Sequence, residues 1–362
     1  MKKVTCFICS MGSGGAEHQM SILATMLVEK GYDVELVTFS GDEYHYPISE
    51  QVRRIRIAKT ENKILKFLSI FWFFLTHKTD CVISFGQREN LFALVPLVFR
   101  PKVKVIAGER NFTIGTIPQT ERILLNYLYW RADYIVPNSY SQRDHILECK
   151  PKFADKVVTI TNYTDTSQYT YIPPVNEDVV KIGIFCRYHK QKNYERFAVV
   201  VKRLKESGYT QLHIDWFGNI GNEDHPNKDY IIFRRMVEEY NIGDILHLNN
   251  HIKNVSLVMP KYDAICVPSL HEGWSNTISE GICCGRPMLV SDVSDNGRMV
   301  INGENGFLFN PLEEDEMYKA FVKFLSISFR ERELMGKHSR EYAYKLFDLD
   351  EFITKYVKLI EN

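Results

Sequence analysis

This sequence of 362 residues has no excess of charge of one sign and no long apolar run. Lysine and arginine number 45, as do aspartate and glutamate, so the chain has no net charge that would attract nucleic acid. The longest apolar stretch, residues 64–75, falls short of the roughly 18–20 residues that span a membrane. The N-terminus lacks the apolar core of a secretory signal, which predicts a cytoplasmic protein.

The eight cysteines form no pattern of a secreted disulfide framework. Most lie inside apolar runs such as "VTCFICS" and "DAICVPS", where cysteine packs as a small hydrophobic residue. The pair Cys6-x-x-Cys9 falls within a predicted strand, so we expect it to pack there and not to hold a metal.

Short β-branched runs alternate with helical patterns in two consecutive series. In the first half the runs predict strands at residues 2–9, 33–39, 80–86, 102–110, 133–139 and 156–162. The polar stretch 162–178 has no helical period and predicts a linker. A second series follows, with helices predicted at 193–207, 228–240 and 277–285.

Such alternation is typical of parallel sheets covered by helices on both faces. We therefore predict an α/β protein with two Rossmann-like domains facing across a cleft. The expected domains are residues 1–166 and 170–345, with the amphipathic C-terminal helix, 346–362, packed back onto the first domain. Ligands of such sheets bind at the carboxyl ends of the strands, which places the expected chemistry in the cleft.

Three stretches follow predicted strands and contain residues suited to a phosphorylated sugar. "GSGGAE", residues 12–17, opens a helix, and its glycines let the backbone approach an anion closely. It is not a complete G-x-G-x-x-G dinucleotide fingerprint, and a tight turn without ligand remains the alternative. "CRYHKQKNYE" places Arg187 and Lys192 where two cations suit a diphosphate, although a solvated loop would look the same.

The third stretch is "SLHEGWSNTISEGICCGRP", with Glu272 in a turn and Glu280 in a helix. An ionised carboxylate only accepts hydrogen bonds, so Glu280 suits the hydroxyls of a ribose and Glu272 those of a second sugar. The free amides at the helix start would hold phosphate. The alternative is that Glu280 complements the helix dipole and Glu272 is merely exposed. His271 is expected to be structural.

These stretches, with "GGAEH" (14–18), "FGNIG" (217–221) and "NGENGFLFNP" (302–311), resemble retaining glycosyltransferases of family 4. Those enzymes have the two-domain GT-B fold, and the two glutamates eight positions apart followed by "GRP" are specific to the group. The chain departs from the pattern at "ITNYTD", where a proline is usual, and at His18, where arginine is frequent.

The resemblance implies a nucleotide-sugar donor, a UDP-sugar first and GDP-mannose second, and a glycan or lipid-linked acceptor in surface polysaccharide or glycoconjugate synthesis. It implies Glu272, Arg187 and Lys192 as catalytic residues, with no metal or other cofactor. The implied donor-binding residues are Gly14, Gly15, Arg187, Lys192, Gly218, Glu272, Gly273, Ser275, Asn276, Thr277 and Glu280. The implied acceptor-side residues are Glu109, Arg110, Asn111 and His18.

Residues 51–104 carry 11 lysines and arginines against 3 acidic residues, around the apolar stretch 64–75. A peripheral contact with an anionic membrane on its inner face and a buried crossover helix both explain this pattern. Two other functions also remain open. One is a GT-B enzyme of another class, a sugar-nucleotide epimerase or a phosphorylase, and the other is a non-catalytic sugar-nucleotide-binding subunit.

Overall fold

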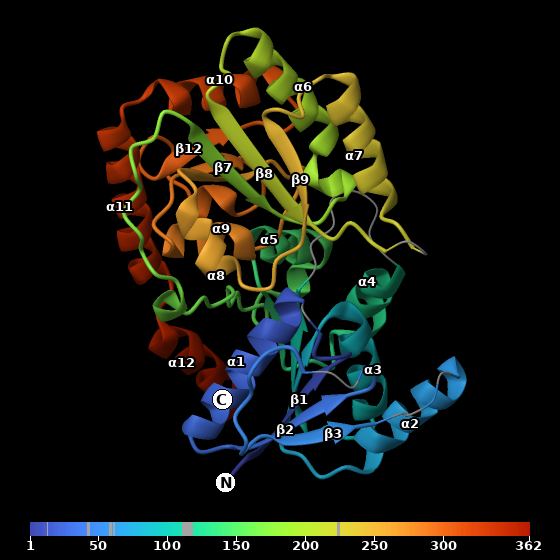
Figure 1. The fold of residues 1–362 in the computed structure, drawn as a ribbon. Coiled ribbons are helices and arrows are strands. Elements are labelled where there is room, and N and C mark those ends of the chain that lie inside the picture. The colour runs from blue at the N-terminus through green and yellow to red at the C-terminus, as the bar shows by residue number, and fades with distance from the viewer. Residues whose placement is uncertain (13, 42–43, 58–59, 61, 111–118, 223–224) are drawn as a thin grey trace. The chain divides into compact units, whose positions relative to one another are not determined.

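The computed structural model describes residues 1–362 except 13, 42–43, 58–59, 61, 111–118 and 223–224 (Figure 1). The chain divides into two compact units. The first unit consists of Met1–Tyr163 together with Leu349–Asn362, and the second of Thr164–Asp348. Each unit is built on one parallel sheet with helices packed on it, as the alternating sequence pattern predicts.

The first sheet has the strand order β3-β2-β1-β4-β5-β6 within the described residues. Its central strands are buried on both faces, as expected of parallel strands between helix layers. The strands are β1 (Lys3–Ile8), β2 (Asp33–Thr38), β3 (Arg53–Arg56), β4 (Cys81–Phe85), β5 (Lys104–Glu109) and β6 (Tyr134–Pro137). The helices are α1 (Gly15–Glu29), α2 (Lys63–Thr76), α3 (Gln87–Leu97), α4 (Gln119–Ile123), continued by a π-helical turn at Leu124–Leu128, α5 (Tyr140–Cys149) and α12 (Leu349–Glu361).

The prediction of a further strand at 156–162 is wrong. This segment runs beside β6 but forms only an isolated bridge, between Ile135 and Val157. The backbone amide of Val158 donates to Ile135 O at 3.0 Å, and that of Ile160 donates to Pro137 O at 3.1 Å. Proline has no amide hydrogen, so Pro137 cannot return the next bond of the ladder. The ladder therefore stops where the sequence pattern suggested it would continue.

The second sheet has the order β12-β11-β10-β7-β8-β9 within the described residues. Counted in chain order this is the same arrangement as in the first sheet. The strands are β7 (Val180–Phe185), β8 (Leu212–Gly218), β9 (Leu246–Asn250), β10 (Ala264–Val267), β11 (Met288–Ser291) and β12 (Gly306–Phe309). The helices are α6 (Tyr194–Glu206), α7 (Lys228–Glu239), α8 (Val255–Val258), α9 (Asn276–Cys283), α10 (Glu314–Ser326) and α11 (Phe329–Leu346).

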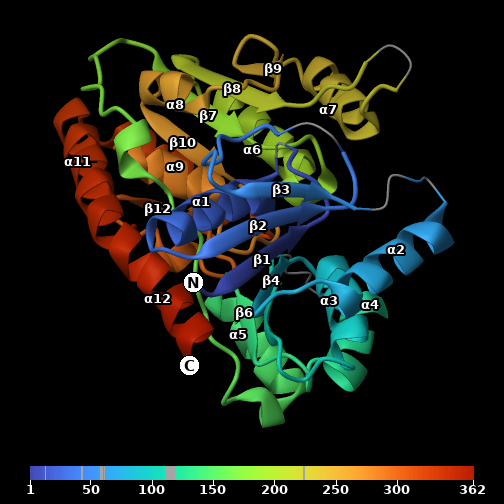
Figure 2. The ribbon, with the colours of Figure 1, turned by 90° about the horizontal axis from the view of Figure 1, so that it is seen from below.

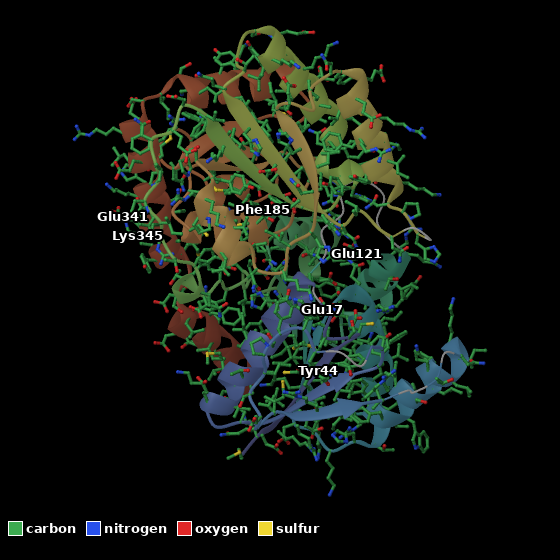
Figure 3. All side chains as sticks on the ribbon, in the orientation of Figure 1. Glu17, Tyr44, Glu121, Phe185, Glu341 and Lys345 are labelled. Atoms are coloured by element: carbon green, nitrogen blue, oxygen red, sulfur yellow. The ribbon has the colours of Figure 1, made fainter. Side chains whose placement is uncertain are left out.

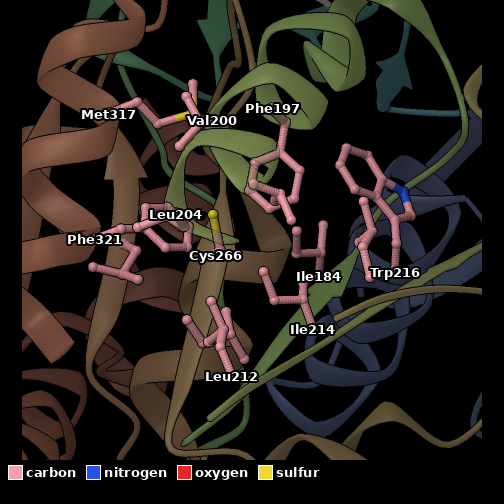
Figure 4. Packing of buried hydrophobic residues seen from close by; sticks show 14 of the residues in the cluster. Ile184, Phe197, Val200, Leu204, Leu212, Ile214, Trp216, Cys266, Met317 and Phe321 are labelled. Atoms are coloured by element: carbon pink, nitrogen blue, oxygen red, sulfur yellow. The ribbon is translucent and has the colours of Figure 1, made fainter. Parts of the chain in front are cut away.

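The core of the second unit packs around the fully buried Trp216 of β8 (Figure 4). Phe197 of α6 meets the indole edge-on at a centroid distance of 5.5 Å. Helix α10 adds Met317 and Phe321 to the same cluster. The apolar spacing of α6 and α10 thus fixes both helices on one face of this sheet.

Helix α12 carries the apolar face seen in the sequence and buries it within the first unit. Tyr356 lies 6.4 Å from the ring of Phe85, and Phe352 lies 5.8 Å from that of Tyr163. At the other end of the helix, Lys104 Nζ donates to Ile360 O at 3.0 Å. Apolar packing and a capping lysine therefore hold α12 on the unit that begins the chain.

The stretch after Tyr163, predicted to be a linker, is fixed to the second unit by the half-buried Arg340 and the buried Arg286. Arg340 of α11 donates to Tyr169 O at 2.7 Å and to Thr166 O at 3.1 Å. Arg286 is 1% exposed and donates to Tyr262 O at 3.2 Å and also to Ile172 O. The arginine of "GRP" thus has a structural role that the sequence pattern did not reveal.

Helix α2 is less buried than its all-round apolar sequence indicates. Among its described side chains only Ile70 and Phe74 are buried. Phe74 packs edge-on against Phe7 of β1, at 4.8 Å between centroids. No helix in the described part of the chain combines the length and apolarity needed to cross a membrane.

Candidate active site

The predicted site residues of the second unit lie where its strand order reverses, between β7 and β10. At such a reversal the loops after the two strands diverge to opposite sides and leave room for a ligand. Residues 186–193 follow β7, and residues 268–275 follow β10. Both motifs singled out from the sequence therefore come from adjacent strand ends of one sheet.

Hydrogen bonds between the two loops hold them in register. The amide of Leu270 donates to Gln191 O at 2.8 Å, and Gln191 Nε2 donates to His271 O at 2.9 Å. Asn193 has a left-handed backbone, φ 60°, and its side-chain amide donates to Pro311 O at 2.8 Å. These contacts fix the backbone on either side of Lys192.

Lys192 and Glu272 form an ion pair at this position. Their side chains are only 13% and 11% exposed, so water and salt screen the pair less than a surface pair. A lysine ammonium offers three donors to phosphate oxygens, and a carboxylate accepts from hydroxyls. The pair can therefore separate to bind a ligand that carries both phosphate and hydroxyl groups.

Arg187 is exposed, in contrast to Lys192. It follows Cys186 at the end of β7, and in the described part of the chain it pairs with no carboxylate. Burial raises the pKa of the Cys186 thiol to about 12, and Lys192, Glu272 and Arg187 all lie close enough to act on it electrostatically. The structure thus gathers the three predicted catalytic residues around the end of β7.

Helix α9 begins beside the same strand end. Thr277 Oγ1 donates to Phe185 O at 2.9 Å, which ties the first turn of α9 to β7. The N-cap residue Ser275 makes no side-chain hydrogen bond to the helix. The first amides of α9, at Asn276 and Thr277, therefore lack a side-chain cap from Ser275 and present the positive end of the helix dipole. Gly273 lies in the turn just before them.

Glu280 lies in the middle of α9 and is half-buried. Burial raises the pKa of its carboxyl to about 7, while a hydrogen bond donated by the Tyr169 hydroxyl opposes that rise. Tyr169 is 6% exposed, and burial beside Glu280 raises the pKa of its phenol in turn. Tyr169 was not predicted as a site residue, because its segment has no periodic sequence pattern.

Two further predicted residues of this unit are accounted for by packing. A Cβ on Gly218 would come within 2.6 Å of Cys186 O, so glycine is required for β8 to approach the loop after β7. His271 has its carbonyl engaged by Gln191, and partial burial lowers the pKa of its imidazole. Both residues therefore help to set the conformation of the loops after β7 and β10.

In the first unit, the predicted glycines stand at the start of α1, the helix that carries Glu17 (Figure 3). Gly14 is the N-cap of α1, and Gly15 its first residue. The carboxylate of Glu17 folds back to the amide end of the helix, 2.2 Å from where a Cβ on Gly14 would stand. Burial raises the pKa of Glu17, and a hydrogen bond from its own backbone opposes that rise. The chain's own carboxylate thus occupies this helix start.

Arg110, predicted on the acceptor side, is engaged within the first unit. Its guanidinium lies over the ring of Phe85, 3.6 Å from the centroid, and donates to the Tyr356 hydroxyl at 2.6 Å. A third contact runs to Asn162 Oδ1 at 3.1 Å. In this structure Arg110 therefore joins α12 to the sheet. His18 stacks on Tyr46 with centroids 4.4 Å apart, and Asn111 lies outside the described residues.

Glu109, at the end of β5, is 1% exposed. Gln142 Nε2 donates to its Oε2 at 3.1 Å, and Asn90 Nδ2 donates to its Oε1 at 3.4 Å. Burial, with Glu121 nearby, raises the pKa of Glu109 to about 8. The carboxyl is therefore largely protonated at neutral pH and sealed among amides.

Comparison with known proteins indicates the class of protein to which this site belongs. Residues 179–326, most of the second unit, match the family model described as "Glycosyl transferases group 1". This match, together with glycosyltransferase relatives along the whole chain, supports a group 1 glycosyltransferase, and the fold with two Rossmann-like domains is of the GT-B type. The matched segment contains the loops after β7 and β10 and all of α9.

Individual relatives agree with this class. The chain is 25% identical over 350 residues to the N-acetylgalactosamine-N,N'-diacetylbacillosaminyl-diphospho-undecaprenol 4-alpha-N-acetylgalactosaminyltransferase of Campylobacter jejuni, covering 90% of each chain. It is 21% identical over 325 residues to the amylovoran biosynthesis glycosyltransferase AmsD of Erwinia amylovora, covering 87% of each. The structure of HepE from Anabaena shares the fold over the whole of both chains, with a TM-score of 0.83 at 14% identity.

Proposed function

We propose that this glycosyltransferase moves a sugar, with retention of anomeric configuration, from a nucleoside-diphosphate sugar to a lipid-linked acceptor in surface polysaccharide or glycan synthesis. The ion pair of Lys192 and Glu272, beside the start of α9, where Ser275 makes no capping hydrogen bond, is the observation that carries the proposal. The ammonium of Lys192 can bind a diphosphate, and the adjacent carboxylate of Glu272 can accept hydrogen bonds from sugar hydroxyls. A UDP-sugar is the favoured donor and GDP-mannose the second.

In this mechanism the bond between the anomeric carbon and the β-phosphate oxygen breaks, and its electron pair stays on the leaving diphosphate. Lys192, Arg187 and the amides of α9 stabilise the growing negative charge in the transition state. The acceptor hydroxyl attacks the same face of the sugar, and its proton passes to an oxygen of the leaving phosphate. Glu272 holds the transferred sugar, and Glu280 accepts hydrogen bonds from the ribose.

The relatives support the donor and acceptor classes. The name of the Campylobacter jejuni relative describes transfer of N-acetylgalactosamine to a diphospho-undecaprenol-linked sugar. The Anabaena protein of like fold is a complex with UDP and glucose. A lipid-linked acceptor would bring the enzyme to the cytoplasmic face of a membrane as a peripheral protein. We propose that no metal ion is required, because fixed cations and amides supply the positive charge.

The test is an assay with radiolabelled UDP-sugars and GDP-mannose on an undecaprenyl-diphosphate-linked glycan, with and without EDTA. We expect transfer from one donor class, unaffected by EDTA, and an α-linked product from an α-linked donor by NMR. An inverted product, or loss of transfer in EDTA, would refute the corresponding part of the mechanism.

Control reactions without acceptor separate the alternative functions. Release of an epimerised sugar nucleotide would identify an epimerase, and sugar 1-phosphate formed with inorganic phosphate a phosphorylase. Tight donor binding without transfer to any acceptor would identify a non-catalytic subunit. The proposed transferase gives slow hydrolysis at most.

A further inference from the structure

Helix α2 presents an apolar face to solvent. Ile64, Leu65, Leu68 and Trp72 are 72%, 53%, 51% and 64% exposed. Their spacing, with 3.6 residues per turn, places all four side chains on one stripe of the helix. The buried residues of α2, Ile70 and Phe74, lie on the opposite side. In both views α2 extends away from its sheet beyond α3, which leaves this stripe uncovered within the first unit (Figures 1 and 2).

The stripe continues onto the residue that follows α3. Phe99 is 67% exposed, and its ring meets that of Phe71 edge-on at 6.4 Å between centroids. Beneath the stripe, Phe67 packs on Phe92 of α3 at 5.8 Å. We call Ile64, Leu65, Leu68, Trp72 and Phe99 the apolar ridge. A monomeric water-exposed protein rarely displays such a contiguous patch unless it binds a protein or a membrane.

The charges around the ridge are mostly positive. Residues 62–79 contain Lys63, Lys66 and Lys78 and no aspartate or glutamate, and Lys102 follows Phe99 closely. Lys63, Lys78 and Lys102 are exposed. A second copy of this chain packed on the ridge by a two-fold axis would bring these lysines against one another, which opposes a dimer. A surface of anionic headgroups would neutralise them.

The dimensions of α2 also suit a lipid surface. Its 14 residues span about 21 Å at 1.5 Å per residue, too short to cross a bilayer. A helix with an apolar face and flanking cations lies in the plane of the interface, with that face in the acyl boundary. Tryptophan such as Trp72 is favoured at this depth.

We propose that the apolar ridge inserts into the surface of an anionic membrane, with Lys63, Lys78 and Lys102 on the headgroups. The inference deepens the proposed lipid-linked acceptor and rests on it for its biological purpose. The binding itself can be tested without any sugar substrate. It gives the basic segment 51–104 a defined lipid-facing surface.

The experiment measures co-sedimentation of the full chain with vesicles of phosphatidylcholine alone or with 30 mol% phosphatidylglycerol, in the absence of nucleotide and acceptor. We expect binding only to the anionic vesicles. The double substitution Leu68→Ser and Trp72→Ser should lower the partition coefficient about tenfold or more, because two inserted side chains are lost. Each of Lys63→Gln, Lys78→Gln and Lys102→Gln should lower it about fivefold.

The matched control is Leu334→Ser on α11, where Leu334 is 51% exposed, like Leu68, but lies beside Glu333. It should leave vesicle binding unchanged. Equal binding by the ridge variant and the wild type, or wild-type dimerisation that Leu68→Ser and Trp72→Ser abolish, would overturn the proposal. Transfer to a short-chain, water-soluble acceptor is measured in parallel. If that transfer fails in the wild type while ridge-dependent binding persists, the proposed function fails and the membrane surface stands.

Discussion

The two units share one strand order, yet the side chains at the point where that order reverses differ between them. In the first unit, Glu17 folds over Gly14 and Glu89 folds over Gly86, so each helix start is occupied by a carboxylate of its own chain. In the second unit, Ser275 leaves α9 without a side-chain cap, and Lys192 stands nearby, paired with Glu272.

This difference supports our proposal that the diphosphate binds mainly to the second unit. Helix amides and cations attract phosphate, whereas the glutamates at the helix starts of the first unit oppose its binding when they are ionised. Burial raises the pKa of both Glu17 and Glu89, and the nearby carboxylate of Glu17 adds to the rise at Glu89. We therefore infer that the same topology can serve an anion in one unit and exclude it in the other, according to which side chain lies at the helix start.

The largest expected effect comes from removing the cation of the second unit. Lys192→Ala should lower kcat by about 10²–10³-fold or more, because the leaving diphosphate loses a fixed positive charge in the transition state. Glu272→Ala should also abolish measurable turnover. Initial rates with saturating donor provide the measurement, and circular dichroism verifies the fold.

Lys190→Ala is the matched control, since Lys190 is an exposed lysine on the same turn. It should retain wild-type kcat. Wild-type rates in Lys192→Ala would remove the proposed role of this residue and with it the contrast between the units.

Carboxylate substitutions sharpen the comparison at the level of donor binding. Glu280→Gln should raise the Kd of the sugar nucleotide by roughly 10-fold, the value of a hydrogen bond to a charged group. Glu17→Gln and Glu89→Gln should leave that Kd within about twofold, because neither residue contacts the donor in our account. Isothermal titration calorimetry measures all three. A larger effect at Glu17 than at Glu280 would reverse the assignment of the units.

The pH dependence of donor binding tests Glu280 further. Its pKa of about 7 lies above the ordinary carboxyl value. The carboxyl of the folded protein without ligand therefore stays protonated up to a higher pH than in the unfolded chain. Glu280 therefore contributes stability at low pH that is lost as pH rises through about 7. Donor binding has the opposite trend, because only the ionised carboxylate accepts two hydrogen bonds from the ribose.

We accordingly expect the affinity for a UDP-sugar to rise as pH increases through about 7, and Glu280→Gln to remove that rise. Tyr169→Phe should move the midpoint upward, because the lost hydrogen bond had favoured the charged form. Affinity that is flat across this range in the wild type would contradict the role of Glu280.

A further expected effect, on the free energy of unfolding and not on catalysis or donor binding, concerns the buried carboxyl of Glu109 in the first unit. With a pKa of about 8, Glu109 holds its proton in the folded state where the unfolded chain has released it. Stability should therefore fall as pH rises from the ordinary carboxyl range to about 8, by up to about 1.4 kcal/mol per pH unit. Denaturant unfolding at several pH values should show a shallower slope in Glu109→Gln than in the exposed control Glu148→Gln. Equal slopes would show that Glu109 titrates normally.

The sequence predicted the sheets and the pairing of the two motifs for related reasons. Parallel strands end at one edge of a sheet, so residues that follow adjacent strands, such as Lys192 and Glu272, must lie close together. Single side chains were less predictable. Tyr169 lies in a segment without period, and its place beside Glu280 depends on Arg340, far along the chain.

Other differences have equally local causes. The family resemblance implies Arg110 on the acceptor side, and the sequence does not reveal that Arg110 also donates a hydrogen bond to Tyr356 of the last helix. The strand expected at 156–162 is interrupted because Pro137 has no amide hydrogen. The exposure of Trp72 also could not be predicted, because the sequence of a helix with apolar residues all round does not indicate which face is buried.

The most direct test of the account is a crystal structure with an intact, non-hydrolysable UDP-sugar analogue. We predict its diphosphate against Lys192 Nζ and the first amides of α9, its ribose on Glu280 and its sugar on Glu272. A nucleotide diphosphate seated instead at the start of α1, with the pair of Lys192 and Glu272 unchanged, would contradict it.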